Sequence, residues 1–303
     1  MESLDNILVC VKQADQAAWL LGYTGAIRRA AKSRRIHLLH VHPPLAPSPG
    51  GQAPPPAPAE LTEDRLRAMA GEHLAGDGSE EVICSSVAGA PLVEILRYAL
   101  DNDVNLIVLG RRKEDEGHQA TLARRVTTKA TCSVLVVPEG ATFRAERILV
   151  PVRNSDCSAR AVEAACLVAA CTQGTVCCLN VFPIRGDYLE ADLTLEEHTA
   201  LMRQWAEREN QQLLSGVSTG GVRTGTLCKP DVFGRPAKVI LETIAGASPD
   251  LVVIGARGRT GAAGVLLGAV TEQLICQSPV PVLAVKKKGE CIGILRALLS
   301  LAG

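Results

Sequence analysis

Aromatic residues are scarce in this chain of 303 residues, which contains three Phe, two Trp and three Tyr. So few rings leave little surface on which nucleic-acid bases can stack, and they require a core built from aliphatic side chains. Net charge is missing as well, because 32 basic residues balance 32 acidic ones. Without a positive field, binding to nucleic acid or to an anionic membrane surface is disfavoured.

Long apolar runs are also absent, since no stretch of about 18 uninterrupted apolar residues occurs. The N-terminus, Met-Glu-Ser-Leu-Asp-Asn, has no basic segment followed by an apolar one. It therefore does not resemble a secretion signal, and we expect a cytoplasmic protein.

The eleven cysteines include no Cys-x-x-Cys pair. Many lie within apolar patterns typical of strands and helices, namely Cys10, Cys132, Cys166, Cys177 and Cys276. We expect buried, reduced thiols rather than a disulfide framework. The neighbours Cys177 and Cys178 should point to opposite faces of a strand, which argues against their ligating one metal ion.

What the chain does have is internal repetition. Hydrophobic residues make up 47% and charged residues 21%, as in globular proteins, and the length suits two domains of about 150 residues. Four segments recur in the same order with similar spacing: Ile7–Val11 with Ile148–Val152, Gly89–Pro91 with Gly234–Pro236, Leu106–Gly110 with Leu251–Gly255, and Val134–Val137 with Val282–Val285. The sequence therefore predicts a tandem duplication.

Each half alternates short aliphatic runs with longer helix-like segments, a pattern typical of a parallel sheet buried on both faces. Strands are expected near 7–11, 36–41, 81–86, 105–109 and 133–137, and again near 147–152, 175–182, 223–228, 250–254 and 281–285. In the first half, helices are expected near 16–32, 61–76, 91–102 and 120–130. Pro91 and Pro236 should begin helices. The predicted fold class is α/β, with two Rossmann-like, doubly wound, five-stranded parallel sheets and any ligand at the carboxyl ends of the strands.

The stretch from Gly255 to Ala269 joins an apolar strand, Leu251–Ile254, to a helix expected from about Gly268. A glycine loop between a strand and a helix N-terminus gathers backbone N–H donors and the positive end of a helix dipole, which together favour phosphate. The alternative is that these glycines serve only a tight turn. The stretch lacks the Gly-Lys-Ser/Thr of a P-loop and the Gly-x-Gly-x-x-Gly fingerprint.

The glycine spacing G-x2-G-x9-G resembles that of the universal stress protein family, and with the repeated strands the resemblance covers nearly the whole chain. It implies two such domains, residues 1–140 and 146–288, followed by a tail helix at 289–303. In ATP-binding members, an Asp after the first strand meets the adenine and ribose end of the nucleotide. The glycine loop holds the phosphates, helped by a Ser or Thr after its last glycine.

The chain departs from this family pattern in both halves. In the second half, Arg153 stands at the Asp position and Ala269 at the hydroxyl position. In the first half, Lys12 stands at the Asp position and Gly110 alone remains of the glycines, with Ala120 and Thr121 aligned to Gly268 and Ala269. We interpret the first site as lost and the second as altered. The candidate nucleotide-binding residues are Val152, Arg153, Gly255, Arg257, Gly258, Arg259, Gly268 and Ala269.

The resemblance implies a non-enzymatic stress-response or signalling protein that binds ATP or another adenine nucleotide in its second half and acts through an unidentified protein partner. Two alternatives stay open: a structural or adaptor protein with both pockets vestigial, and a very slow ATPase. No catalytic residue is identified. No metal site is predicted, because His37, His40 and His42 lie along one strand without further ligands, and only His40 and His42 share a face. The acidic residues Glu190, Asp192, Glu196 and Glu197 indicate a solvated helix entrance.

Assembly rests on the family resemblance and on two segments outside the repeat. In the family the last strands, here Val134–Val137 and Val282–Val285, commonly pair across a twofold axis, which predicts pairing within this chain and a homodimer of two chains. The proline-rich segment 43–59 is expected to be an exposed loop, either a plain linker or a ligand for a partner. The tail 291–303 is expected to pack on protein as a short amphipathic helix, with a membrane-surface foot as the alternative.

Overall fold

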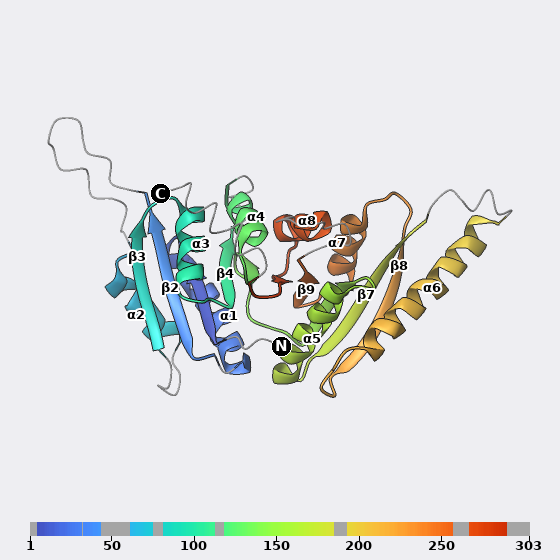
Figure 1. The fold of residues 1–303 in the computed structure, drawn as a ribbon, viewed down its shortest axis with the longest axis horizontal. Helices are drawn as coiled ribbons and strands as arrows, with labels where there is room; N and C mark the ends of the chain where they lie inside the picture. The colour runs from blue at the N-terminus through green and yellow to red at the C-terminus, as the bar shows by residue number, and fades with distance from the viewer. Residues whose placement is uncertain are drawn as a thin grey trace. The chain divides into compact units, whose positions relative to one another are not determined.

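The computed structural model describes residues 5–31, 33–43, 61–74, 81–112, 118–184, 193–256 and 267–289. The chain divides into two compact units. The N-terminal unit comprises Glu2–Phe143 together with the segment from Lys287 onward, and the C-terminal unit comprises Arg144–Lys286. In Figure 1 the first unit's repeat runs from blue to green, and the second unit's from green to red.

The N-terminal unit alternates strands and helices throughout. Its strands are β1 (Asn6–Cys10), β2 (Arg35–His42), β3 (Glu81–Ala88), β4 (Leu106–Arg111) and β5 (Ser133–Pro138). Its helices are α1 (Ala14–Ala31), α2 (Glu63–His73), α3 (Pro91–Asp101) and α4 (His118–Lys129). The strands pair in parallel in the order β3-β2-β1-β4-β5.

The C-terminal unit repeats this design. Its strands are β6 (Arg147–Val152), β7 (Thr175–Pro183), β8 (Arg223–Asp231), β9 (Leu251–Gly255) and β10 (Val282–Val285). Its helices are α5 (Asp156–Thr172), α6 (Leu195–Ser215), α7 (Pro236–Ala247) and α8 (Ala269–Gln277). The strands pair in parallel in the order β10-β9-β6-β7-β8. The predicted fold class, two doubly wound five-stranded α/β domains, is confirmed.

The interior positions of the central strands of both sheets are buried, which explains their aliphatic sequences. Ile7, Leu8 and Val9 of β1 are inaccessible to solvent, as are Val252 and Val253 of β9. Because the helices cover both faces, these interior positions do not meet water, and polar side chains at every second position would be buried without hydrogen-bond partners. The scarcity of aromatics is thus matched by an aliphatic core.

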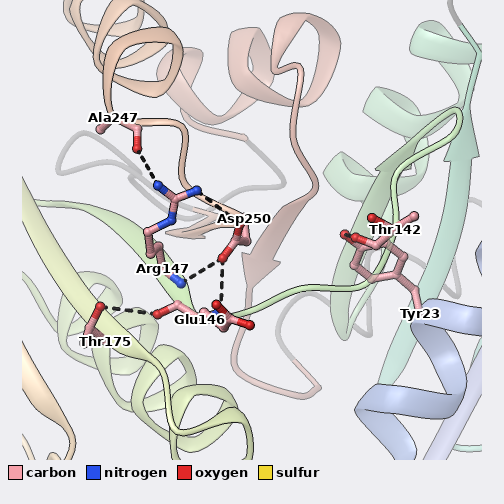
Figure 2. A network of polar contacts seen from close by, with 7 residues as sticks. All are labelled: Tyr23, Thr142, Glu146, Arg147, Thr175, Ala247 and Asp250. Atoms are coloured by element: carbon pink, nitrogen blue, oxygen red, sulfur yellow. Dashed lines mark hydrogen bonds and ion pairs between the residues drawn. The ribbon is translucent and has the colours of Figure 1, made fainter.

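Polar anchors at the amino ends of the strands set the register of β9 against β6 (Figure 2). The Asp250 carboxylate accepts hydrogen bonds from the backbone N–H groups of Glu146 and Arg147, at 3.2 and 2.9 Å. The Arg147 guanidinium pairs with the same carboxylate at 3.6 Å and lies 3.5 Å from the Ala247 carbonyl. In the N-terminal unit, Asn105 plays the same part, since its side-chain oxygen accepts from the Asn6 N–H at 3.0 Å.

Helix starts follow the expected local signals. Pro91 and Pro236 occupy the first turns of α3 and α7, as predicted. Glu197 does lie at a solvated helix entrance, where it forms a capping box with Thr194 at the start of α6. These hydrogen bonds to Thr194 lower the pKa of the exposed Glu197 carboxyl. Glu190 and Asp192 lie outside the described residues.

No helix in the described ranges is long and apolar enough to cross a membrane. The proline-rich segment from residue 44 onward and the tail 291–303 lie outside those ranges, so the expectations about them stay predictions. The chain before the tail is anchored to the N-terminal unit, because the Gly289 N–H donates to the Thr131 carbonyl at 2.9 Å and Lys288 pairs with Asp103 at 2.7 Å.

Candidate functional site

The strand order of the C-terminal unit reverses between β6 and β9, and this reversal creates the candidate site. From β6 the chain moves outward to β7 and β8, and then returns to the other side of β6 to form β9 and β10. The connections after β6 and β9 therefore leave in opposite directions. Doubly wound sheets bind ligands at the carboxyl ends of two such strands, and we call this edge of the C-terminal unit the crevice. Five of the predicted residues, Val152, Arg153, Gly255, Gly268 and Ala269, lie at this edge.

Gly255 ends β9 against the first turn of α5. A Cβ atom at this position would lie 2.8 Å from the Cys157 carbonyl oxygen and 2.9 Å from the Cys157 Cβ. Both distances are too short for a side chain, so only glycine lets the helix approach the strand so closely. The close approach keeps the N-terminus of α5 directly beside the crevice.

Gly268 and Ala269 begin helix α8 at the same edge. The Gly268 N–H donates to the Ala256 carbonyl at 3.0 Å, and the buried Thr271 hydroxyl donates to the Gly255 carbonyl at 3.1 Å. These two bonds tie α8 to the end of β9. Because the cap residue is glycine, it offers no side-chain oxygen to the N–H groups of the first turn. Those donors and the exposed Ala269 are suited to face an anion.

Arg153 follows β6 on the other side of the crevice. Its backbone N–H donates to the Ser158 hydroxyl at 3.0 Å, and Ser158 is itself 8% exposed. Ser155, the N-cap of α5, accepts from the Ser158 N–H at 3.2 Å, as its sequence position predicts. The Arg153 backbone is thus fixed, while its side chain is exposed and makes no hydrogen bond or ion pair to any described residue.

Of the remaining predicted site residues, one is buried and three are not described. Val152 is 4% exposed, so its side chain belongs to the core and supports the crevice from below. Arg257, Gly258 and Arg259 lie outside the described residues, and their part in the site stays a prediction. The residues that the structure does bring to one edge come from the ends of β6 and β9 and from the start of α8.

The corresponding edge of the N-terminal unit is closed by its own side chains. A Cβ atom at Gly110, which precedes the last residue of β4, would lie 2.6 Å from the Trp19 indole of α1. Asp15, in the first turn of α1, forms an ion pair with Arg112 beyond the end of β4. The buried Gln16 side chain accepts from the Lys12 backbone N–H at 3.2 Å. Trp19 thus occupies the space beside Gly110, and the ion pair spans the strand end.

Sequence reasoning missed the residues that shape both edges: Trp19, Cys157, Ser158 and Thr271. Ser158 carried a weak signal. In the pattern Ser-x-x-Ser after a strand, the first serine caps a helix and accepts a hydrogen bond from the backbone N–H of the second. Cys157 and Trp19 carried none, since each matters through contact with a glycine far away in the sequence.

The remaining candidates show no reactive chemistry in the described residues. Ten cysteines there are free thiols, and burial raises the pKa of Cys178 to about 12. The adjacent thiols Cys177 and Cys178 differ in exposure, consistent with opposite faces of β7. His40 and His42 stack at 6.0 Å between ring centroids, as expected from a shared face. No cluster of three or more metal-ligating side chains occurs among the described residues.

Comparisons with known proteins agree with the two-unit fold. The family model described as the universal stress protein family matches residues 3–138 and again residues 145–286. A universal stress protein of Methanocaldococcus jannaschii is 30% identical over 146 residues, which are 47% of this chain and 82% of that protein. One from Thermus aquaticus is 30% identical over 139 residues, 46% of this chain and 97% of that protein.

Solved structures of similar length share the fold. A universal stress protein from Archaeoglobus fulgidus superposes with a TM-score of 0.62 at 20% identity, covering 94% of this chain and 97% of its own. A functionally unknown protein from Pseudomonas aeruginosa superposes with a TM-score of 0.66 at 19% identity, covering 99% and 97%. With two matches that together span most of its length, the chain belongs to the universal stress protein family, as a tandem of two such domains.

Proposed function

We propose that this protein is a non-enzymatic, cytoplasmic stress-response protein that binds an adenine nucleotide in the crevice of its C-terminal unit and acts through a protein partner. The observation that carries the proposal is the first turn of α8, which receives no side-chain cap from Gly268 and lies beside the end of β9. A 5′-phosphate group placed there meets backbone donors and the positive end of the helix dipole.

Binding rather than catalysis is favoured by what the nearby side chains already do. The Ser155 hydroxyl caps α5, the Ser158 hydroxyl accepts from the Arg153 N–H, and the Thr271 hydroxyl donates to the Gly255 carbonyl. Each polar group holds the backbone in place, so none is left as a general base or nucleophile in the described part of the crevice. A very slow ATPase therefore has less support than a binding protein.

An adaptor protein with two vestigial pockets is the second candidate. It is favoured by the Trp19 indole and the Asp15–Arg112 ion pair, which close the N-terminal edge, and by Ala269 in place of a hydroxyl. Under this proposal the C-terminal crevice is a remnant as well, and protein contacts alone carry the function.

Native mass spectrometry and calorimetry of the purified full-length chain separate the two candidates. We expect one ATP or ADP per chain. The variant Ala269→Asp places a carboxylate at the first turn of α8, where it favours the helix but repels phosphate, and should abolish binding. The matched change Thr121→Asp at the aligned position of the N-terminal unit should leave binding unchanged. An unliganded protein that no adenine nucleotide binds supports the adaptor instead.

A further inference from the structure

Arg153 is the candidate nucleotide-binding residue to which the phosphate position on α8 gives no role. Its backbone is anchored through Ser158, its side chain is exposed at the end of β6, and no described acidic residue pairs with it. The acidic side chain that follows it most closely in the sequence, Asp156 in the first turn of α5, is exposed and makes no ion pair with it. A guanidinium held this way is ready for an anion supplied by a ligand.

The crevice therefore offers two positive elements on neighbouring strands. The first turn of α8 follows β9, and Arg153 follows β6, which pairs directly with β9. If the 5′-phosphate of a nucleotide lies on α8, its ribose can reach the end of the adjacent strand β6, because ligands of doubly wound sheets bind across the ends of both strands at the reversal. Arg153 is the side chain that a ribose in this position would meet.

Guanidinium and ribose hydroxyls recognise each other poorly. An arginine has five N–H donors and no acceptor, so it cannot take the hydrogen bonds that a ribose diol donates. It binds a phosphate ester strongly, through two parallel charge-assisted hydrogen bonds. In dinucleotide-binding folds the same choice separates ligands, because an acidic residue accepts from a free ribose hydroxyl whereas an arginine accommodates a ribose phosphate.

We infer that the proposed nucleotide site prefers adenine nucleotides with a second phosphate on the ribose, at the 2′ or the 3′ oxygen. Nucleotides with a free ribose diol should bind less tightly. This inference rests on the proposed function. The N-terminal unit does not share this preference. Its cation at the corresponding position, Lys12, lies beside an edge that Trp19 and the Asp15–Arg112 pair already close.

Three isomeric ligands test the inference: ADP, adenosine 3′,5′-bisphosphate and adenosine 2′,5′-bisphosphate each carry two phosphates and differ in where the second one is attached. Each bisphosphate carries about one more negative charge than ADP at neutral pH, because it has two phosphomonoesters, and the variant Arg153→Asp separates this general charge effect from the contact with Arg153. Calorimetric titration of the full-length protein should give at least one bisphosphate a Kd about tenfold lower than that of ADP, the ratio expected from one charge-assisted pair. The tighter bisphosphate identifies which ribose oxygen faces Arg153.

The variant Arg153→Asp should remove this preference and make ADP the tighter ligand, because a carboxylate accepts from the diol and repels the second phosphate. Lys12→Asp, the matched change in the N-terminal unit, should alter no affinity, and a thermal melt of each variant checks that it folds. If the wild type binds ADP as tightly as both bisphosphates, this inference is wrong and the nucleotide site stands. If the wild type binds none of the three, the proposed function fails with it.

Discussion

Gly110, next to the last residue of β4, and Gly255, the last residue of β9, occupy matching positions of the two units, yet each excludes a side chain for a different reason. At Gly255 the obstacle is the Cys157 backbone of the neighbouring helix, whereas at Gly110 it is the Trp19 indole. A backbone obstacle cannot move without shifting the helix, but an indole can rotate. The matching glycines are thus constrained by a helix backbone in one unit and by an indole ring in the other.

The change Gly255→Ala should therefore destabilise the C-terminal unit by about 1–3 kcal/mol, the range for overpacking at a close contact. Gly246→Ala is the matched control, since Gly246 lies within α7 and a Cβ atom added there would meet nothing within 4 Å. Alanine there should be neutral or should stabilise by about 0.5–1 kcal/mol, because it restricts the unfolded chain and favours the helix. Urea denaturation followed by circular dichroism measures the free energy of unfolding of both variants. Equal effects of the two variants would contradict the close contact between Gly255 and Cys157.

His37 is a buried histidine that links the stability of the N-terminal unit to pH. It is 2% exposed, its Nδ1 lies 3.1 Å from the Tyr98 hydroxyl, and its buried Nε2 has no hydrogen-bond partner among the described residues. Burial lowers the pKa of His37, the positive charge of Arg35 lowers it further, and Glu81 partly opposes them. The folded state therefore prefers the neutral imidazole.

Below about pH 6.5, the ordinary pKa of histidine, the unfolded chain binds a proton at His37 that the folded chain does not, so stability should fall as the pH decreases. For one proton, the free energy of unfolding should fall by up to about 1.4 kcal/mol per pH unit. The decrease ends below the pKa of His37 in the folded state, where both states bind the proton. Denaturation curves between pH 7.5 and pH 5 measure it. His37→Phe should flatten the slope, whereas His73→Gln, at an exposed position on α2, should leave it unchanged; an equal slope in all three proteins would rule out His37 as the cause.

At the scale of the elements, a polar residue just before β4 and just before β9 accepts backbone hydrogen bonds from the first strand of each unit. Asn105 accepts from Asn6, and Asp250 accepts from Glu146 and Arg147. This anchor fixes the strand pair at the amino end, so that the opposite end, which carries the crevice, keeps its register. The two units thus repeat these polar hydrogen bonds at the strand ends as well as the apolar core.

The sequence predicted the elements well because their apolar runs and helix-start residues are local signals. It placed β6 at its observed residues and began α3 and α7 at their prolines. It ended β8 near residue 228, but the strand continues to Asp231, because pairing with β7 extends to Pro183 despite the polar residues there. The closure of the N-terminal edge could not be predicted, since the packing of Trp19 on Gly110 depends on a contact between distant residues.

At the scale of the whole molecule, the C-terminal unit exposes apolar side chains that suit an interface. Phe233 and Val232, after β8, are 83% and 53% exposed, and Leu201 and Trp205, one turn apart on α6, are also exposed. The Asp231 carboxylate accepts from the Phe233 and Arg235 N–H groups, so the loop that presents Phe233 is held by hydrogen bonds. Rigid, exposed aromatic and aliphatic side chains are typical of association sites.

We therefore expect a homodimer, in which Phe233 and Val232 of both chains become buried around a twofold axis. Light scattering across a dilution series should report twice the monomer mass, and the double variant Val232→Asp with Phe233→Asp should report a monomer. The control Val222→Asp introduces a charge before β8 at the other end of the strand and should leave the dimer intact.

Deleting residues 291–303 tests the expected contribution of the tail to the dimer. An unchanged dimer after the deletion removes only that contribution, whereas a full-length monomer at every concentration contradicts the expected homodimer itself.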